Sequence, residues 1–348
     1  MIGDVEEAYT TTSPASRIGG ALLCLFTFML GLCMADVAIA QTNADPAEEW
    51  MKEGSADLGA RKYDDAMKAF KKANQLRHDS CADCLLEMAI VESKTGEFDH
   101  ALKDCDRAIA CATTDSVRVM SHALKGNILQ NVEPDPKRLK ASEGEYRAAI
   151  ALDAKNASAH LNLGIVLLRE SQQAEGLAEL NSYLKIAPNG PDAPYAKKLI
   201  EKPKEVGRAL APALEVTTLS GDVFALDQMA GKVVVMDFWA TWCPPCRESV
   251  PELKALTQKY PHDKLIVVSF SADNDEQAWK SFIAQKNMDW AQYWDHDGRI
   301  RAQFGVNAFP TYLVVDPDGF VYKRIVGLNP QMSVVGQLKD ALKVILPE

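Results

Sequence analysis

The chain is 348 residues long, which exceeds one domain of roughly 100 to 200 residues and predicts two domains with additional segments. Its 47% of apolar residues is typical of a globular protein with buried cores. The formal net charge is −10 and no run of lysine and arginine offsets it, which argues against nucleic acid or an anionic membrane surface as a partner.

Residues 1–40 have the pattern of a secretory signal peptide. An uncharged apolar run, Ile18–Met34, follows Arg17, and the small-x-small triplet Ala38-Ile39-Ala40 ends the segment. The run is near the shortest length that spans a bilayer, so an uncleaved membrane anchor is the main alternative. Both interpretations predict that the rest of the chain lies in the periplasm or another extracytoplasmic compartment, where disulfides persist.

The segment 46–202 contains an internal repeat. Small and aromatic residues in 50–73 recur at helix-face spacings, and a similar set follows about 35 residues later in 85–108. Two further copies, after Ser121 and near His160, fit more loosely. The pattern resembles the tetratricopeptide repeat family, which implies an all-α stack of helix pairs. That resemblance also implies binding of an unknown protein partner, with a spacer role as the alternative.

Four cysteines fall in the second copy: Cys81, Cys84, Cys105 and Cys111. If 82–95 and 97–111 form an antiparallel helix pair, Cys84 can reach Cys105 and Cys81 can reach Cys111, and an oxidising compartment favours such structural disulfides. Pairing of Cys81 with Cys84 stays open, because connectivity is not readable from sequence. A four-thiolate zinc site is disfavoured, since one pair alone has ligand-like spacing, and no metal site is predicted.

Residues 203–213 form a charged, proline-bearing linker, and the periodicity changes after it. Two nearly continuous apolar runs of strand length, Gly231–Ala240 and Lys264–Ala272, flank a helical pattern that begins at Cys246. Strand, helix and strand in this order predict parallel pairing in a sheet covered on both faces.

The end of the chain continues the α/β pattern of a second domain, residues 214–348. Thr311–Asp316 and Phe320–Gly327 are apolar segments separated by a turn sequence, which predicts a hairpin, and 332–344 predicts a last helix. The predicted fold class is therefore multidomain: an all-α helical repeat followed by an α/β domain with a central mixed sheet flanked by helices.

Two cysteines lie where the first central strand ends and its helix begins. Free backbone N–H groups and the positive dipole end of a helix favour a thiolate, so Cys243 is predicted to be the exposed nucleophile. Cys246, one turn further along the same side, is predicted to be the buried resolving thiol. Pro244 and Pro245 suit the first helical turn and remove two N–H donors from Cys243, which favours a reductant. A redox-active Cys243–Cys246 disulfide needs no other cofactor.

The segment "DFWATWCPPC" resembles the active site of the thioredoxin superfamily, over about 214–346. The additional helix between Asp273 and Pro310 is similar to that of the TlpA-like thiol:disulfide oxidoreductases. The resemblance implies that Asp237 is the proton acceptor behind the cysteines, with a hydrogen-bonded structural acid as the alternative. Ser269 stands where thioredoxins have a lysine beside this acid. The implied substrate-binding residues, which include a cis-proline loop, are Trp242, Pro244, Pro245, Phe309, Pro310 and Gly327.

These observations predict an exported thiol:disulfide oxidoreductase that reduces protein disulfides. Its implied partners are a disulfide-bearing protein substrate and a membrane or periplasmic thiol electron donor. A non-catalytic periplasmic interaction scaffold is the alternative function. Peroxidase chemistry is disfavoured, because Met236 and Ala240 stand where peroxiredoxins have proline and a hydroxyl residue. Trp290 and Trp294 are interpreted as packing residues.

Overall fold

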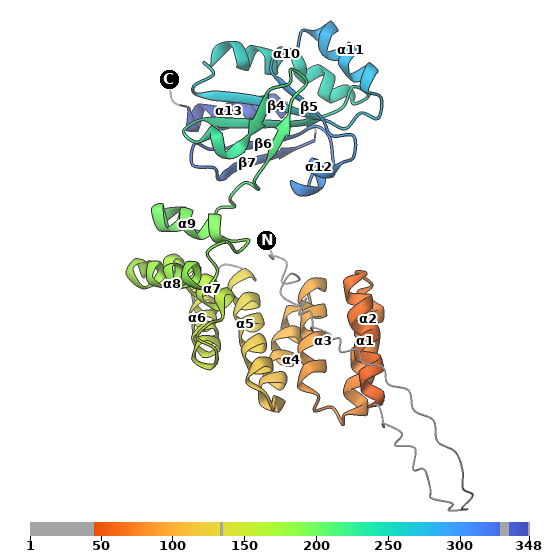
Figure 1. The fold of residues 1–348 in the computed structure, drawn as a ribbon, viewed down its shortest axis with the longest axis vertical. Helices are drawn as coiled ribbons and strands as arrows, with labels where there is room; N and C mark the ends of the chain where they lie inside the picture. Colours follow the sequence, from red (N-terminus) through yellow and green to blue (C-terminus); the bar gives the residue numbers. More distant parts are fainter. Residues whose placement is uncertain (1–44, 133–134, 328–333, 347–348) are drawn as a thin grey trace, which may run out of the picture. The chain divides into compact units, whose positions relative to one another are not determined.

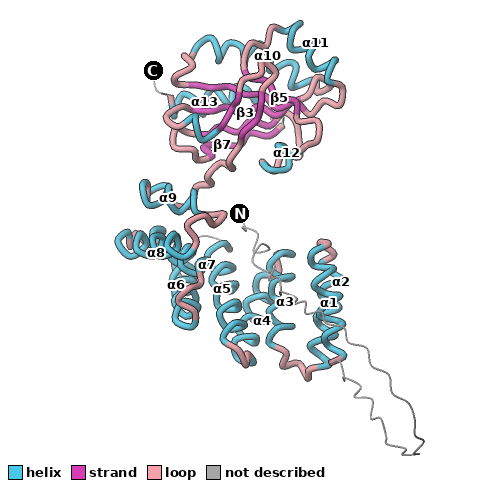
Figure 2. Tube along the Cα trace, viewed as in Figure 1, coloured by secondary structure: helices cyan, strands magenta, loops and turns pink. Residues whose placement is uncertain are grey.

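The computed structural model describes residues 45–132, 135–327 and 334–346 (Figure 1). The chain divides into two compact units, with the boundary between Val206 and Gly207. Within the described residues, strands occur only in the second unit, whereas the first unit is helical (Figure 2). The predicted signal peptide or anchor at 1–40 lies outside the described residues. None of the helices in the described ranges is long and apolar enough to cross a membrane.

The first unit is a series of helix pairs that ends in a short helix. The pairs are α1 (Pro46–Gly59) with α2 (Tyr63–Leu76), α3 (Ala82–Thr95) with α4 (Phe98–Cys111), α5 (Asp115–Asn131) with α6 (Pro136–Leu152), and α7 (Ala157–Arg169) with α8 (Gln173–Ile186), and α9 (Ala193–Glu201) follows. The predicted all-α repeat architecture is confirmed.

Glycines allow the two helices of a pair to approach closely. A Cβ added at Gly54 would lie 2.5 Å from the Phe70 ring, and one added at Gly126 would lie 2.8 Å from the Tyr146 ring. Both aromatic side chains are fully buried. The close packing of a small residue on a large one therefore occurs in both the first and the third pair.

The cysteines of the second helix pair differ from the favoured prediction. Cys81 is bonded to Cys84, the pairing that the sequence left open, and Cys105 and Cys111 are free thiols. The reason is the direction of the side chains. Cys84 packs in a cluster with residues of α1 and α2, whereas Cys105 packs in a cluster that extends to Ile128 of α5. The two predicted bridges between α3 and α4 are therefore wrong.

The second unit contains a five-stranded mixed sheet with the order β5-β4-β3-β6-β7. The strands are β3 (Val233–Trp239), β4 (Leu265–Ser271), β5 (Ala291–Trp294), β6 (Thr311–Val315) and β7 (Val321–Val326). Strands β3, β4 and β5 pair in parallel, whereas β3 with β6 and β6 with β7 are antiparallel. The parallel crossover and the C-terminal hairpin agree with the sequence prediction.

Helices and a small hairpin surround this sheet. They are α10 (Pro244–Lys259), α11 (Glu276–Lys286), α12 (Arg299–Gln303), α13 (Val334–Ile345), the 3-10 helix η3 (Leu226–Met229), and the paired strands β1 (Glu215–Thr217) and β2 (Val223–Ala225), whereas the 3-10 helix η2 (Pro203–Glu205) belongs to the first unit. Val233 and Val235 of β3 pack in the cluster that contains α10, α11 and α13. Val234 and Met236 pack in the cluster that contains α12 and the β1–β2 hairpin. Strand β3 is thus buried on both faces.

The end of the predicted linker is part of the second unit. The N–H of Ala211 donates to the carbonyl of Gly319 at 2.9 Å, and the N–H of Val321 donates to the carbonyl of Ala209 at 2.8 Å. Arg208 pairs with Asp316 at 2.6 Å. Ordered structure in this unit therefore begins several residues before the predicted start at Leu214.

Candidate active site

Strand β3 leads directly to the cysteine pair at the start of α10. Cys243 is the N-cap of that helix, Pro244 and Pro245 occupy its first two positions, and Cys246 follows in the first turn. The N–H of Cys246 donates to Cys243 Sγ at 3.3 Å, and the two cysteines form a disulfide. The predicted helical placement of both prolines is confirmed, since a residue without an N–H loses little in a first turn.

Both cysteines are buried, which differs from the predicted exposure of Cys243. The exposed fraction is 4% for Cys243 and 3% for Cys246. Both belong to the apolar cluster that includes Trp239 and Val250, because the N-cap position holds Cys243 against the end of β3. Trp242, at 61%, and Pro244 are the exposed residues of the motif.

The proline loop lies beside this cluster. The peptide bond between Phe309 and Pro310 is cis, and the N–H of Gly327 donates to the carbonyl of Pro310 at 2.9 Å. Phe309 packs against the cluster that contains both cysteines, and its ring meets the Trp242 ring edge-on with centroids 5.8 Å apart. The structure therefore brings Trp242 and the proline loop together, as the resemblance implied.

Asp237 lies in the middle of β3. It is 2% exposed, and its position in the strand places it on the face that packs against α10, together with Val235 and Trp239. Ser269, its register partner on β4, donates from Oγ to Asp237 Oδ2 at 2.8 Å. Ser269 Oγ in turn accepts from Trp290 Nε1 at 2.8 Å, so Trp290 has a polar role in addition to packing.

The environment of Asp237 favours a protonated carboxyl. Asp237 Oδ1 is buried without a hydrogen-bond partner among the described residues. Burial raises the pKa of Asp237 from 3.8 to about 7, and the hydrogen bond from Ser269 opposes this rise only in part. A carboxyl with a pKa near neutrality can accept a proton and release it again, which is the property that a proton acceptor needs.

Sequence reasoning missed the support of the loop before Cys243. Asp273, two residues after β4 ends, accepts from the N–H of Thr241 at 3.0 Å and from Thr241 Oγ1 at 2.6 Å. Ser271 Oγ also donates to Asp273, at 2.6 Å, and the carboxylate is 3% exposed. Asp273 thereby fixes the segment that presents Trp242 and Cys243. The available signal was a buried-strand sequence that ends in Asp273, since loops after adjacent parallel strands meet at one edge.

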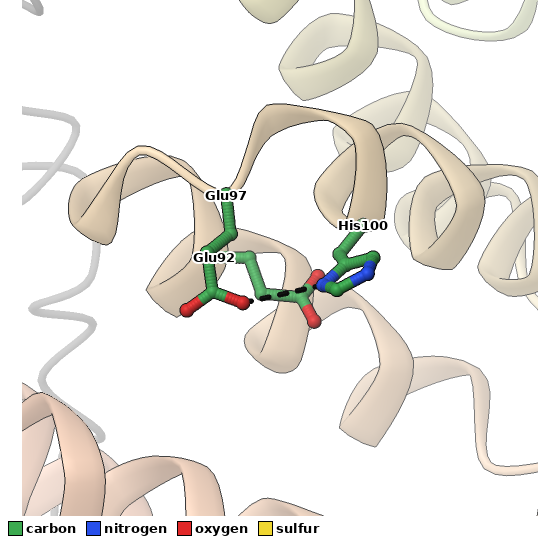
Figure 3. A group of neighbouring side chains, drawn as sticks. All are labelled: Glu92, Glu97 and His100. Atoms are coloured by element: carbon green, nitrogen blue, oxygen red, sulfur yellow. Dashed lines mark hydrogen bonds and ion pairs between the residues drawn. The ribbon is translucent and has the colours of Figure 1, made fainter.

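A group of side chains that can hold a metal ion lies in the first unit, where α3 ends and α4 begins. Glu92, Glu97 and His100 have ligand atoms within 4.8 Å of one another (Figure 3). Glu92 is buried, whereas Glu97 and His100 are exposed and pair with each other at 3.2 Å. Two carboxylates and an imidazole suit a divalent cation. The sequence pattern gave no indication of this group, and it takes no part in the cysteine chemistry of the second unit.

Two family models match the chain. The model described as Redoxin matches residues 205–345, and one described as Tetratricopeptide repeat matches residues 138–191. The second match falls on α6, the second helix of the third pair, and on the fourth pair, in the part of the repeat that fitted the pattern more loosely by sequence.

Two relatives and one solved structure illustrate the similarity. The "Thiol-disulfide oxidoreductase ResA" of Bacillus thuringiensis subsp. konkukian (strain 97-27) is 33% identical over 147 residues, which cover 42% of this chain and 82% of the relative. The "Thioredoxin-like protein YneN" of Bacillus subtilis (strain 168) is 35% identical over 130 residues, 36% of this chain and 75% of the relative. A putative thiol:disulfide interchange protein DsbE from Chlorobium tepidum is 31% identical and covers 39% of this chain and 96% of its own, with a TM-score of 0.35.

The match extends over most of the ResA relative. Residues 205–345, which the Redoxin model matches, contain a cysteine pair at a helix start, a buried carboxyl on the α10 face of the sheet and a cis-proline loop. The prediction of an enzyme is thereby confirmed. The chain belongs to the ResA-type thiol-disulfide oxidoreductases of the thioredoxin-like redoxin family, with tetratricopeptide repeats ahead of the redoxin domain.

Proposed function

We propose that this protein reduces disulfides of exported proteins through Cys243 and Cys246. The observation that carries the proposal is the Cys243–Cys246 disulfide in the first turn of α10, next to the Phe309–Pro310 loop. The pair in this position stores two electrons when it is reduced and releases them by thiol–disulfide exchange.

The reaction begins with the reduced pair. The Cys243 thiolate attacks one sulfur of the substrate disulfide, the other substrate sulfur leaves as a thiolate, and a mixed disulfide forms. Cys246 transfers its proton to Asp237, and its thiolate attacks Cys243 Sγ, which releases the second substrate sulfur. The substrate is reduced by two electrons and the enzyme is oxidised to the Cys243–Cys246 disulfide. A dithiol electron donor on the membrane or in the periplasm then reduces the enzyme again.

The extended backbone beside Pro310 and the exposed ring of Trp242 form the proposed substrate-binding surface, with Phe309 and Gly327 at its side. An unfolded or extended segment around the substrate cysteine suits such a surface, because main-chain hydrogen bonds and an aromatic contact bind many sequences. Pro244 and Pro245 favour reduction of the substrate, since they provide no N–H to stabilise the Cys243 thiolate.

We place the reaction outside the cytoplasm because of the pattern in residues 1–40, as a cleaved signal peptide or a membrane anchor. The repeat unit is proposed to bind a protein partner, which supplies either the substrate or the electron donor. The helix pairs support this role, since repeats of this kind present extended binding surfaces.

Trapping of the mixed disulfide tests the proposal. The Cys246→Ser variant of the full chain keeps the nucleophile but lacks the resolving thiol, so it should accumulate a substrate bonded to Cys243, which mass spectrometry of non-reduced complexes detects. Cys243→Ser is the matched control and should trap nothing through this pair. Equal capture of substrate by both variants would contradict the mechanism. So would a Cys246→Ser variant that captures no substrate and still reduces insulin disulfides at the wild-type rate.

A further inference from the structure

The first unit contains a second cysteine pair in the same local setting as the first. Cys81 is the N-cap of α3, and its Sγ accepts from the N–H of Cys84 at 3.1 Å, compared with 3.3 Å for the Cys246 N–H and Cys243 Sγ. The exposed fraction is 5% for Cys81, which is similar to the 4% of Cys243, whereas Cys84 is 0% exposed. Cys81 is therefore the residue of this pair that keeps some exposed surface.

A fixed positive charge lies beside Cys81. Arg77 Nη1 donates to Cys81 Sγ at 3.4 Å, and the Nε and Nη2 atoms of the same guanidinium contact Asp45 Oδ2 at 2.8 and 2.7 Å. The N–H of Cys81 donates to Asn74 Oδ1 at 3.1 Å, which holds the residue in place. A guanidinium and a helix N-terminus stabilise a thiolate strongly and a disulfide sulfur weakly, so both favour the reduced state of this pair. Asp83, between the two cysteines, is exposed, and solvent screens its charge.

A purely structural role gives little physical reason for this disulfide. The stabilisation that a disulfide provides grows with the length of the loop it closes, and Cys81 and Cys84 close one of the shortest loops available. The first turn of α3 already fixes the backbone between them. A bridge from α3 to α4 would constrain far more of the unfolded chain, and the structure does not form one.

We propose that Cys81–Cys84 is a second redox-active disulfide, which a protein dithiol reduces by attack on Cys81. One thiolate of the dithiol bonds to Cys81 Sγ, the Cys81–Cys84 bond breaks, and Cys84 leaves and takes up a proton. The second thiolate of the dithiol then attacks the other sulfur of the dithiol, which is bonded to Cys81, and Cys81 leaves as a thiolate beside Arg77. The dithiol loses two electrons and becomes a disulfide, and the pair in α3 gains them.

Redox titration of the full chain tests this site separately from the Cys243–Cys246 pair. A Cys243→Ser/Cys246→Ser variant is equilibrated in mixtures of reduced and oxidised dithiothreitol, alkylated and digested with trypsin. Residues 78–94 contain Cys81 and Cys84 in one tryptic peptide, without Cys105 or Cys111. We expect both cysteines to be alkylated together, reversibly, at a reduced-to-oxidised ratio within about tenfold of that for the Cys243–Cys246 pair in the wild-type chain. If Cys81 and Cys84 in peptide 78–94 stay oxidised until the dithiothreitol mixture also unfolds the chain, as circular dichroism would show, the proposal is overturned.

Two single-cysteine variants test which sulfur reacts. In the same background, Cys84→Ser should form a mixed disulfide with oxidised glutathione at Cys81 at least about tenfold faster than Cys81→Ser forms one at Cys84. Cys105 is an internal control for a buried thiol, because burial raises its pKa to about 12. Equal rates for Cys81 and Cys84, or a rate at Cys81 no greater than at Cys105, would refute the assignment of Cys81.

Substitutions at Arg77 test the cause. Arg77→Ala should require about tenfold more reduced dithiothreitol for half-reduction, and Arg77→Lys should require less than Arg77→Ala because it keeps the charge. Asp45→Asn removes the carboxylate that competes for Arg77 and keeps the guanidinium, so reduction should become no harder. An unchanged midpoint in folded Arg77→Ala would contradict the role of this charge. If Arg77→Ala does not fold, the Asp45→Asn variant decides. A Cys81–Cys84 pair that is harder to reduce in that variant than in the wild-type chain would contradict the role of this charge.

Discussion

The two cysteine pairs of this chain begin helices in the same way, but their surroundings differ. Cys243 and Cys81 are both N-caps, and each accepts a hydrogen bond from the cysteine three residues later. The residues between the pair at α10 are two prolines, whereas Ala82 and Asp83 separate the pair at α3. The helix start therefore supplies the geometry of exchange, and the neighbouring groups determine its direction and its substrates.

The neighbours of each pair indicate different partners. The pair at α10 follows the exposed Trp242 and lies in a cluster that Phe309 of the proline loop contacts, with the carboxyl of Asp237 on the same face of the sheet. The pair at α3 contacts a guanidinium and packs with Ala47 and Ala73, and Trp50 and Met51 pack against the same cluster. The first arrangement suits extended protein substrates and proton transfer. The second stabilises a thiolate, which suits reduction by a dithiol.

Removal of the sulfurs is expected to have the largest effect and to separate the two pairs. Cys243→Ser should lower insulin disulfide reduction by roughly 10³-fold or more, because no other group replaces the attacking thiolate. Serine at both Cys81 and Cys84 should lower the same activity far less, because the proposed substrate-binding residues Trp242 and Phe309 belong to the second unit. Cys111→Ser is the control for loss of a free thiol. Similar losses at the two pairs would show that they act as one site.

Asp237→Asn is expected to have the next largest effect. Exchange should slow by roughly 10² to 10³-fold at the step in which Cys246 resolves the mixed disulfide, because asparagine cannot accept the proton. Single-turnover kinetics should show a normal first attack by Cys243 and a slow release of substrate. A structural role of Asp237 alone would leave this second rate unchanged.

Asp237→Asn is also expected to change how the stability of the fold depends on pH. The folded-state pKa of Asp237, about 7, is higher than its ordinary 3.8, so between these pH values the folded chain keeps a proton that the unfolded chain has lost. The free energy of unfolding should therefore fall as the pH rises through this window, by up to roughly 4 kcal/mol in total at about 1.4 kcal/mol per pKa unit. Asp237→Asn should lack this fall. Denaturant titrations of both proteins at pH 4, 6 and 8 measure the difference.

Exchange of the residues between the cysteines tests what sets the two equilibria. Pro244→His should stabilise the Cys243 thiolate and shift the Cys243–Cys246 equilibrium toward the reduced pair by about tenfold, or about 30 mV. Ala82→Pro removes an N–H at the first position of α3, where proline is tolerated, and should shift the Cys81–Cys84 pair in the opposite direction. Titrations in glutathione buffers measure both. Two unchanged midpoints would mean that the intervening residues do not control either pair.

The sequence predicted the features that depend on short segments. Strands β3 and β4 were evident from continuous apolar runs, and Cys243 and Cys246 from their place between a strand and a helix. The short strand β5 (Ala291–Trp294) was missed because four residues carry too little periodicity. The proposed Cys84–Cys105 bridge was wrong because the direction of Cys84 depends on packing against α1 and α2, which the α3–α4 pair alone does not determine. The contact of Asp273 with Thr241 likewise joins residues that are distant in the chain.

Thr241→Val should have the smallest effect of these changes. Thr241 Oγ1 donates to the buried Asp273 carboxylate, which also accepts from the Thr241 N–H and from Ser271. Loss of one donor to a buried charge should lower the free energy of unfolding by about 1.5 to 3 kcal/mol, whereas Thr241→Ser should cost less because it keeps the hydroxyl. If Asp273 positions the loop before Cys243, valine should also slow the first attack on substrate. If it only stabilises the fold, denaturant midpoints will shift while the rate of attack remains that of the serine variant. Cys81 and Asn74, whose side chain holds it, both lie in the first unit. The redox midpoint of the Cys81–Cys84 pair should therefore be the same in Thr241→Val as in the wild-type chain.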